Sequence, residues 1–218
     1  SGGVTGSSFL VSTTRARVLV DCGLFQGSRT ERELNARDFP YRPAALDAVL
    51  LTHAHIDHSG LLPRLMVQGY AGPIWATPAT RDLCAVMLPD SAHIQEKEAE
   101  FDTRRRFHAN LKREGARMRP DMPPLYTVAQ AQASLRRLNP VDYDLEIAPH
   151  PPVRCTFRDA GHILGSAILE VWVEEGGARR KIVFSGDLGQ PGRPLLRSRA
   201  DSRRGLPAGR INLRRPQP

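Results

Sequence analysis

Three histidines and an aspartate crowd into one short segment of the 218-residue chain. The segment LLTHAHIDHSG, residues 50–60, opens with an apolar run typical of a buried strand. His53 and His55 are alternate residues, so in an extended segment their side chains point the same way, and Asp57 and His58 follow on the turn into the next helix. Imidazoles and a carboxylate suit zinc, and this spacing can divide them between two adjacent ions. The segment predicts a metal centre rather than unrelated polar residues in a surface loop.

A centre of two metal ions needs more ligands than one loop presents, and two later segments can supply them. DAGHILGSA places His162 after a predicted strand, and FSGDLG places Asp187 directly after another. In open α/β sheets, ligands collect beyond the carboxyl ends of strands, where the following loops converge. Either segment alone would be weak evidence, but both complete the set that the first cluster requires. The predicted metal ligands are therefore His53, His55, Asp57, His58, His162 and Asp187.

The elements that must carry these residues alternate between strands and helices. Strands are expected at residues 8–12, 17–20, 48–52, 73–76, 145–147, 153–157, 167–173 and 181–184. Helices are expected at residues 60–68, 77–115 and 128–138. The last of these helices opens with a possible capping box, Thr127 with Gln130. Strand pairs at both ends of the chain with helices between them predict an α/β fold, a layered mixed sheet covered by helices.

The net charge of +8 is concentrated at one end of the chain. From Gln190 onward there are eight arginines and one acidic residue, which leaves 23 basic and 22 acidic residues in positions 1–189. The final segment is rich in Pro, Gly and Arg and has neither helical nor strand periodicity. We expect one folded domain over residues 1–189 and a disordered tail over residues 190–218, either RNA-binding or, as we favour, a truncated or out-of-frame end of a longer protein.

Cysteine spacing and hydropathy indicate the compartment. Cys22, Cys84 and Cys155 lie far apart without a CxxC pair, which argues against a disulfide framework or a thiolate zinc site. We expect them to be small core residues in a reducing, cytoplasmic setting. No segment approaches the ~20 consecutive apolar residues that a membrane span needs, so we expect no membrane association.

The chemistry-bearing segments resemble a known family. THAHIDHSG resembles the metal-binding loop of the metallo-β-lactamase superfamily. DAGHILGSA, FSGDLG and the upstream VDCGLFQG resemble the β-CASP nucleases, the branch that includes the RNA 3′-end processing endonuclease and ribonuclease J. The SAHIQEKEAEF segment is similar to bacterial RNA-processing members of that branch. The resemblance covers residues 2–190 and implies an αββα sandwich.

The resemblance also implies roles for individual residues. Two Zn²⁺ ions are implied, one held by His53, His55 and His162 and the other by Asp57 and His58, with Asp187 bridging them. Asp21 is implied to support the metal loop from behind, although an aspartate that caps a turn explains it equally well. The implied reaction is hydrolysis of phosphodiester bonds in an RNA substrate by a hydroxide that bridges the metals, with Asp57 as the catalytic group that orients it. Such a ligand set also accepts other first-row divalent metals.

The sequence departs from the family pattern at its carboxyl end. Family members continue beyond FSGDLG into a cap domain and a return segment with a last metal-binding histidine, whereas His162 is the last histidine here. We therefore expect an incomplete sandwich without the β-CASP cap and the C-terminal return segment. Two alternatives stay open: a thioester or lactone hydrolase on the same scaffold, and a non-catalytic metal-binding or RNA-binding remnant. The RNA target, endonucleolytic or exonucleolytic action and oligomeric state also stay open.

Overall fold

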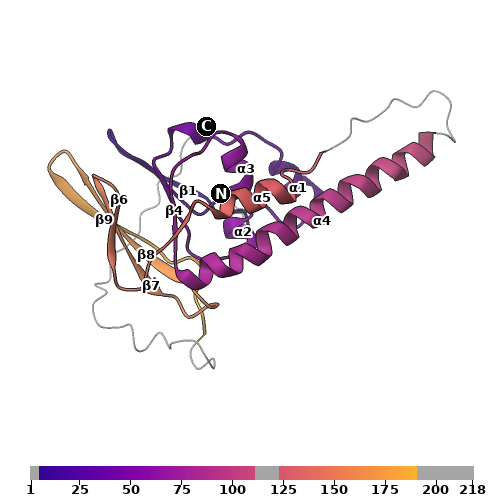
Figure 1. The fold of residues 1–218 in the computed structure, drawn as a ribbon. Helices are drawn as coiled ribbons and strands as arrows, with labels where there is room; N and C mark the ends of the chain where they lie inside the picture. Colours follow the sequence, from indigo (N-terminus) through magenta and orange to yellow (C-terminus); the bar gives the residue numbers. More distant parts are fainter. Residues whose placement is uncertain (1–4, 111–122, 191–218) are drawn as a thin grey trace.

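The computed structural model describes residues 5–110 and 123–190, which form two sheets with helices on one side (Figure 1). The first sheet has the order β1-β2-β3-β4-β5, and its strands are Phe9–Ser12, Arg17–Val20, Ala48–Leu50, Ile74–Ala76 and Leu138–Pro140. The second has the order β6-β7-β8-β9, with strands Glu146–His150, Val153–Asp159, Ala167–Glu175 and Ala178–Phe184. The helices are α1 (Arg29–Leu34), α2 (Ile56–Ser59), α3 (Leu62–Val67), α4 (Pro78–Asn110) and α5 (Val128–Leu135), with a 3₁₀ turn η1 at Pro43–Ala45. The expected α/β class is confirmed.

The first sheet is mixed, as expected, and apolar on both faces. Strand β1 pairs antiparallel with β2, whereas β2, β3, β4 and β5 are parallel to one another. Alternate side chains of β2 and β3 enter two different cores: Val18 and Leu50 face the second sheet, and Leu19 and Val49 face the helices. Burial on both faces explains why these strands read as continuous apolar runs.

The second sheet is an antiparallel meander packed face to face on the first. Its inward side chains, among them Phe157, Leu169 and Val171, are fully buried against Val18 and Leu50. This core between the sheets fixes how the second sheet sits on the first. The expectation of buried cysteines is also confirmed, because Cys22, Cys84 and Cys155 are all free and buried.

Helices α3, α4 and α5 cover the outer face of the first sheet. Helix α4 buries Cys84, Leu88 and Ala92, which recur every fourth residue and so share one face. Its later turns extend past the sheet (Figure 1), where Phe101 is 64% exposed. Among the described helices, none combines the length and apolar character needed to cross a membrane.

Three of the four layers of an αββα sandwich are present in the described part of the chain. Within residues 5–110 and 123–190, no helix covers the outer face of the second sheet (Figure 1). This arrangement agrees with the expected incomplete sandwich. Residues 111–115 of the expected long helix and residues 191–218 of the expected tail lie outside the described residues, so the division at residue 189 remains a prediction.

The expected elements differ from the observed ones at the ends of helices and of strands, and β9, for example, begins at Ala178 instead of residue 181. The helix expected at residues 60–68 corresponds to α3, and a separate short helix, α2, precedes it and contains Asp57 and His58. The helix expected to reach Leu138 stops at Leu135, because Leu138 pairs with Ile74 in the parallel sheet and tertiary pairing overrides the helical pattern.

Four elements were not expected at all: strand β5, helices α1 and α2, and the 3₁₀ turn η1. Strand β5 forms through the pairing of Leu138 with Ile74, which no local sequence pattern specifies. Helix α1 could have been predicted from the sequence, because Ser28 and Glu31 form a reciprocal capping box at its start. The capping box expected at Thr127 and Gln130 is confirmed.

Gly23 is a position where the fold leaves no room for a side chain. A Cβ there would lie 1.6 Å from the carbonyl oxygen of Asp57, in the turn that follows β3. We expect Gly23→Ala to lower the free energy of unfolding by roughly 1–3 kcal/mol, because the obstacle is backbone and the loop must shift. Urea denaturation in EDTA measures the change. Gly177→Asn, in the β8–β9 turn with open space around it, should cost little. Equal stability of Gly23→Ala and the unmodified protein would contradict the described packing.

Candidate metal centre

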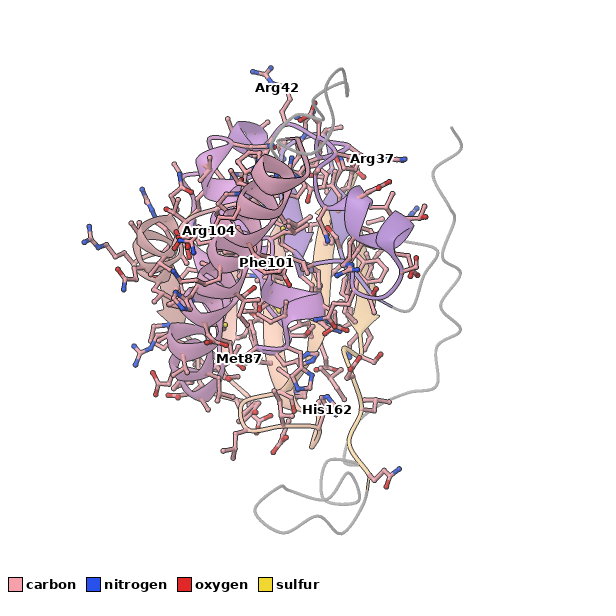
Figure 2. The ribbon with its side chains drawn as sticks, turned by 90° about the vertical axis from the view of Figure 1, so that its right-hand side faces the viewer. Arg37, Arg42, Met87, Phe101, Arg104 and His162 are labelled. Atoms are coloured by element: carbon pink, nitrogen blue, oxygen red, sulfur yellow. The ribbon has the colours of Figure 1, made fainter. Side chains whose placement is uncertain are left out.

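The candidate site lies at one end of both sheets, where the loops after four strands meet. Parallel strands β2 and β3 end at the same edge, and β7 and β9 both end beside the start of β8. In Figure 2, His162 marks this edge and Arg42 lies at the opposite end of the molecule. The convergence of strand ends that the sequence indicated is therefore present.

The loop after β3 presents its polar residues in the expected directions. Residues 51–54 form a loop with a bend at Thr52, and His55 occupies the N-cap of α2 with φ −55° and ψ 144°. The backbone N–H of His58 donates to the His55 carbonyl at 2.9 Å, which closes the first turn of α2. This turn carries Asp57 and His58 round to the same edge as His53.

The second sheet contributes two loops that are bonded to each other and to the first sheet. His162 lies on the loop of residues 160–166 between β7 and β8, and Asp187 follows β9. The Gly189 N–H donates to the Ala160 carbonyl at 3.0 Å. The Ala167 N–H donates to the Thr52 carbonyl at 2.8 Å, directly behind the histidines.

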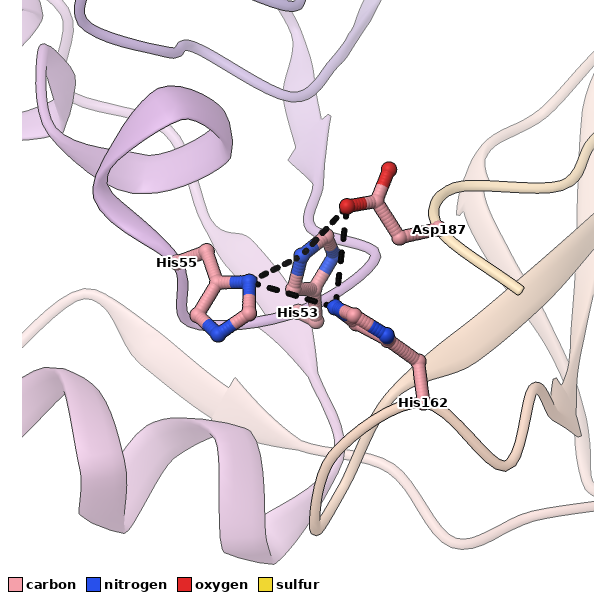
Figure 3. Close-up of side chains that lie close together, drawn as sticks. All are labelled: His53, His55, His162 and Asp187. Carbon is pink, nitrogen blue, oxygen red and sulfur yellow. Dashed lines mark hydrogen bonds and ion pairs between the residues drawn. The ribbon is translucent and has the colours of Figure 1, made fainter. Parts of the chain in front are cut away.

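Four side chains form a compact group, which we call the four-residue cluster: His53, His55, His162 and Asp187 (Figure 3). One nitrogen or oxygen from each lies within 4.8 Å of the others. Nδ1 of His55 is 3.2 Å from Nε2 of His53 and 3.3 Å from Nε2 of His162. Oδ2 of Asp187 is 3.9 Å from Nε2 of His53 and 3.6 Å from Nε2 of His162. Three ring nitrogens and a carboxylate therefore surround one point.

Asp187 also faces the remaining two predicted ligands. Its Oδ1 is 3.4 Å from Nε2 of His58, and Oδ2 of Asp57 is 3.8 Å from the same nitrogen. One carboxylate oxygen thus points at the four-residue cluster and the other at His58. The geometry offers a second position, lined by Asp57 and His58, with Asp187 shared between the two.

The electrostatics suit a site that receives a cation. Burial, followed by the neighbouring His58, His55 and His162, lowers the pKa of His53 to about 2, so this ring is neutral near pH 7. A neutral imidazole has a free lone pair, which a metal ligand requires. The chemistry of these donors therefore fits a divalent metal ion.

Asp21 and His58 form a buried pair behind the cluster. Asp21 follows β2 and adopts φ 57°, and its Oδ2 is 2.8 Å from Nδ1 of His58. Burial acts to lower the pKa of His58, but the hydrogen bond to Asp21 and the charges of Asp21, Asp57 and Asp187 outweigh it and raise that pKa. Burial raises the pKa of Asp21, against the hydrogen bonds from His58 and Thr52. The contact occupies Nδ1 of His58 and leaves Nε2 facing the second position.

Thr52 is a residue of the site that the sequence reasoning missed. Its N–H donates to Oδ1 of Asp21 at 2.8 Å, and its hydroxyl lies 3.0 Å from both Asp21 oxygens and 3.0 Å from Nδ1 of His53. The only signal in the sequence is its place between a buried strand and the first histidine. Thr52 links the aspartate behind the site to the histidine in front.

The Thr52 hydroxyl can be tested with two matched variants. Thr52→Val keeps the side-chain shape but leaves the fully buried Asp21 carboxyl short of a donor, and we expect it to lower the free energy of unfolding by roughly 1–3 kcal/mol. Thr52→Ser keeps the hydroxyl and should lie close to the unmodified protein. Chemical denaturation in EDTA compares them. A Thr52→Val protein as stable as the serine variant would show that the hydroxyl contributes nothing.

A family model described as "Metallo-beta-lactamase superfamily" matches residues 1–215. The chain belongs to the metallo-beta-lactamase superfamily. This confirms the resemblance drawn from the THAHIDHSG segment.

Two curated proteins are among the relatives that the chain matches in sequence. It is 34% identical over 186 residues to "Transcription termination factor FttA" of Methanosarcina mazei. The match covers 83% of this chain and 25% of that protein. It is 35% identical over 193 residues to "Ribonuclease TTHA0252" of Thermus thermophilus, covering 88% of this chain and 37% of that protein. The chain thus spans between a quarter and little more than a third of the length of these two relatives.

Solved structures agree with the fold. A metallo-beta-lactamase of Cronobacter sakazakii matches with a TM-score of 0.51 at 18% sequence identity, covering 89% of this chain and 57% of that one. At this identity the match supports the fold alone.

Proposed function

We propose that the site binds two divalent metal ions, zinc by ligand type, and that the protein hydrolyses phosphodiester bonds in RNA as a member of the β-CASP branch. In this proposal His53, His55 and His162 hold one ion, Asp57 and His58 hold the other, and Asp187 bridges them. The observation that carries it is the position of Asp187, which directs Oδ2 at the four-residue cluster and Oδ1 at His58. Histidine and carboxylate donors suit zinc, although other first-row metals accept them.

RNA as the substrate is supported by the relatives. One of them is named a ribonuclease and the other a transcription termination factor, and both are about one-third identical to this chain. The free, buried cysteines support a reducing, cytoplasmic setting. The activity of the whole protein is a proposal, because the chain covers only 25–37% of these relatives.

The chain's own residues would prepare the site in three ways. Bound metal ions would supply an activated water and positive charge beside the phosphate. Asp57, part-exposed at the mouth of the site, would accept a hydrogen bond from the attacking water and orient it. Asp21 would hold His58 by Nδ1 and leave Nε2 free to bind. Thr52 would fix Asp21 and the His53 ring together.

A second candidate function is hydrolysis of a thioester or lactone on the same scaffold. The donor set of the site admits it, because a metal-activated hydroxide can also attack a carbonyl carbon. The same site would then attack a carbonyl carbon instead of phosphorus. A third candidate, a metal-binding remnant without activity, predicts metal without turnover.

The metal content of the purified chain tests the centre directly. We expect about two equivalents of metal per chain, with zinc preferred, because the residues form two adjacent sets of donors. His55→Ala should lose metal from the cluster, whereas His93→Ala, an exposed histidine on α4, should keep it. Elemental analysis of protein purified without added metal provides the count. No metal in the unmodified chain would refute the centre.

RNA cleavage tests the proposed reaction. Metal-loaded protein should cleave single-stranded RNA, and EDTA should abolish the cleavage. His55→Ala should reduce the rate by more than the roughly 10–100-fold that loss of a residue behind a ligand costs, because it removes the ligand itself. The 218-residue chain and the product of the whole reading frame that encodes it are assayed side by side, with an activated thioester and a lactone as competing substrates. Ester cleavage without RNA cleavage would favour the second candidate.

A further inference from the structure

The loop that carries His162 is bonded to the start of helix α4, far away in the sequence. The hydroxyls of Thr77 and Thr80 both donate to the carbonyl of Gly165, at 2.7 and 2.8 Å. Thr77 and Thr80 are 1% and 0% exposed. Thr77 directly follows β4, and Thr80 lies in the first turn of α4. One backbone oxygen of the second sheet therefore receives two hydrogen bonds from the first sheet's side.

The contact is so close that position 165 admits only glycine. Gly165 has φ +80°, and a Cβ there would lie 2.4 Å from the Thr80 nitrogen and 2.7 Å from each of the two hydroxyl oxygens. A side chain would both strain the backbone and separate the loop from α4. The glycine and the two threonines thus form one contact, which we call the Gly165 anchor.

The anchor connects to His162 through Ser166. The Ser166 Oγ accepts from the N–H groups of His162 and Ile163, at 3.0 and 3.2 Å, and the Tyr143 hydroxyl donates to the Ser166 carbonyl at 2.9 Å. The Gly165 carbonyl and the Ser166 nitrogen belong to the same planar peptide group. These hydrogen bonds hold the loop on both sides of residue 165. They therefore fix the backbone position from which the His162 side chain reaches His55.

We propose that Thr77 and Thr80 are positioning residues of the metal centre, and that they set the place of His162 through the carbonyl of Gly165. His162 comes from the second sheet, whereas His53 and His55 come from the first, so their meeting depends on contacts that join the two sheets at this edge. The anchor is such a contact. This inference rests on the metal centre of the proposed function, and it adds two residues that lie outside the histidine and aspartate segments.

Thr80→Val is the cleaner variant for a test. The Thr80 hydroxyl donates to Gly165, whereas Thr77 also accepts from the Thr80 N–H at 3.2 Å and so caps helix α4. Thr80→Ser keeps the hydroxyl and is the rescue variant. Thr156→Val, at a buried threonine in the middle of β7, is the matched control for loss of a buried hydroxyl away from the anchor.

The first measurement is amide hydrogen exchange of the metal-free protein. Thr80→Val should speed exchange of the His162, Ile163 and Ser166 amides by roughly 2- to 10-fold, the equivalent of one hydrogen bond, and Thr80→Ser and Thr156→Val should not. Unchanged exchange in these amides would overturn the proposal. An equal increase across the whole protein would also overturn it, because the effect would then be global.

The second measurement is zinc affinity, by competition with a chelator, in a double-mutant cycle with His162→Ala. Thr80→Val should weaken zinc binding about tenfold in the otherwise unmodified protein. In the His162→Ala background it should change affinity by less than about twofold, because the ligand that it positions is gone. Equal weakening in both backgrounds would show a merely structural role and overturn the proposal.

The two measurements separate this inference from the proposed function. If the unmodified protein bound no zinc, the metal centre would fail, while the exchange of the loop amides would still decide whether the threonines anchor the loop. If zinc bound normally and Thr80→Val altered neither measurement, the centre would stand and the positioning role would fail.

Discussion

The packing of the second sheet on the first is the constraint on which the candidate site depends. Val18 and Leu50 of the first sheet meet Phe157, Leu169 and Val171 of the second in a core with almost no exposed surface. Interiors packed at this density respond to small volume changes, so the relative placement of the two sheets is well defined. This packing also fixes the geometry of the four-residue cluster, because the first sheet supplies His53 and His55 while the second supplies His162 and Asp187.

Polar contacts at the edge refine what the apolar core sets. The Ala167 N–H reaches the Thr52 carbonyl, and the Gly165 carbonyl reaches the threonines at the start of α4. These contacts lie at the ends of regular elements, between two sheets that no strand pairing joins. One backbone hydrogen bond and two side-chain hydroxyls on the Gly165 carbonyl therefore connect the sheets at this edge, as strand ladders connect strands inside each sheet. The site is built from loops, but its ligands originate at strand ends and are held by bonds that cross between sheets.

The sequence predicted those parts of the site that depend on local spacing. Alternate spacing predicted a common direction for His53 and His55, and the apolar run located β2 at its observed bounds. Contacts between residues far apart in the sequence could not be predicted from local patterns. Strand β5 exists because Leu138 pairs with Ile74, and the contact of Thr80 with Gly165 spans 85 residues. The position of Asp187, with one carboxylate oxygen toward the four-residue cluster and the other toward His58, likewise depends on how the second sheet packs on the first. Helix α1 was missed although its capping box was legible.

The two sheets are also separate along the chain, and this has a thermodynamic consequence. Strands β1 to β5 come from residues 9–140 and strands β6 to β9 from residues 146–184, so each half is one continuous stretch. An ion held by donors from both stretches binds the docked form and not the separated one. At a concentration a thousandfold above its dissociation constant, such an ion adds about 4 kcal/mol to the stability of the docked form. An ion bound at the proposed centre would then join the two halves of the chain, and its removal by a chelator would lower the stability of the docked form.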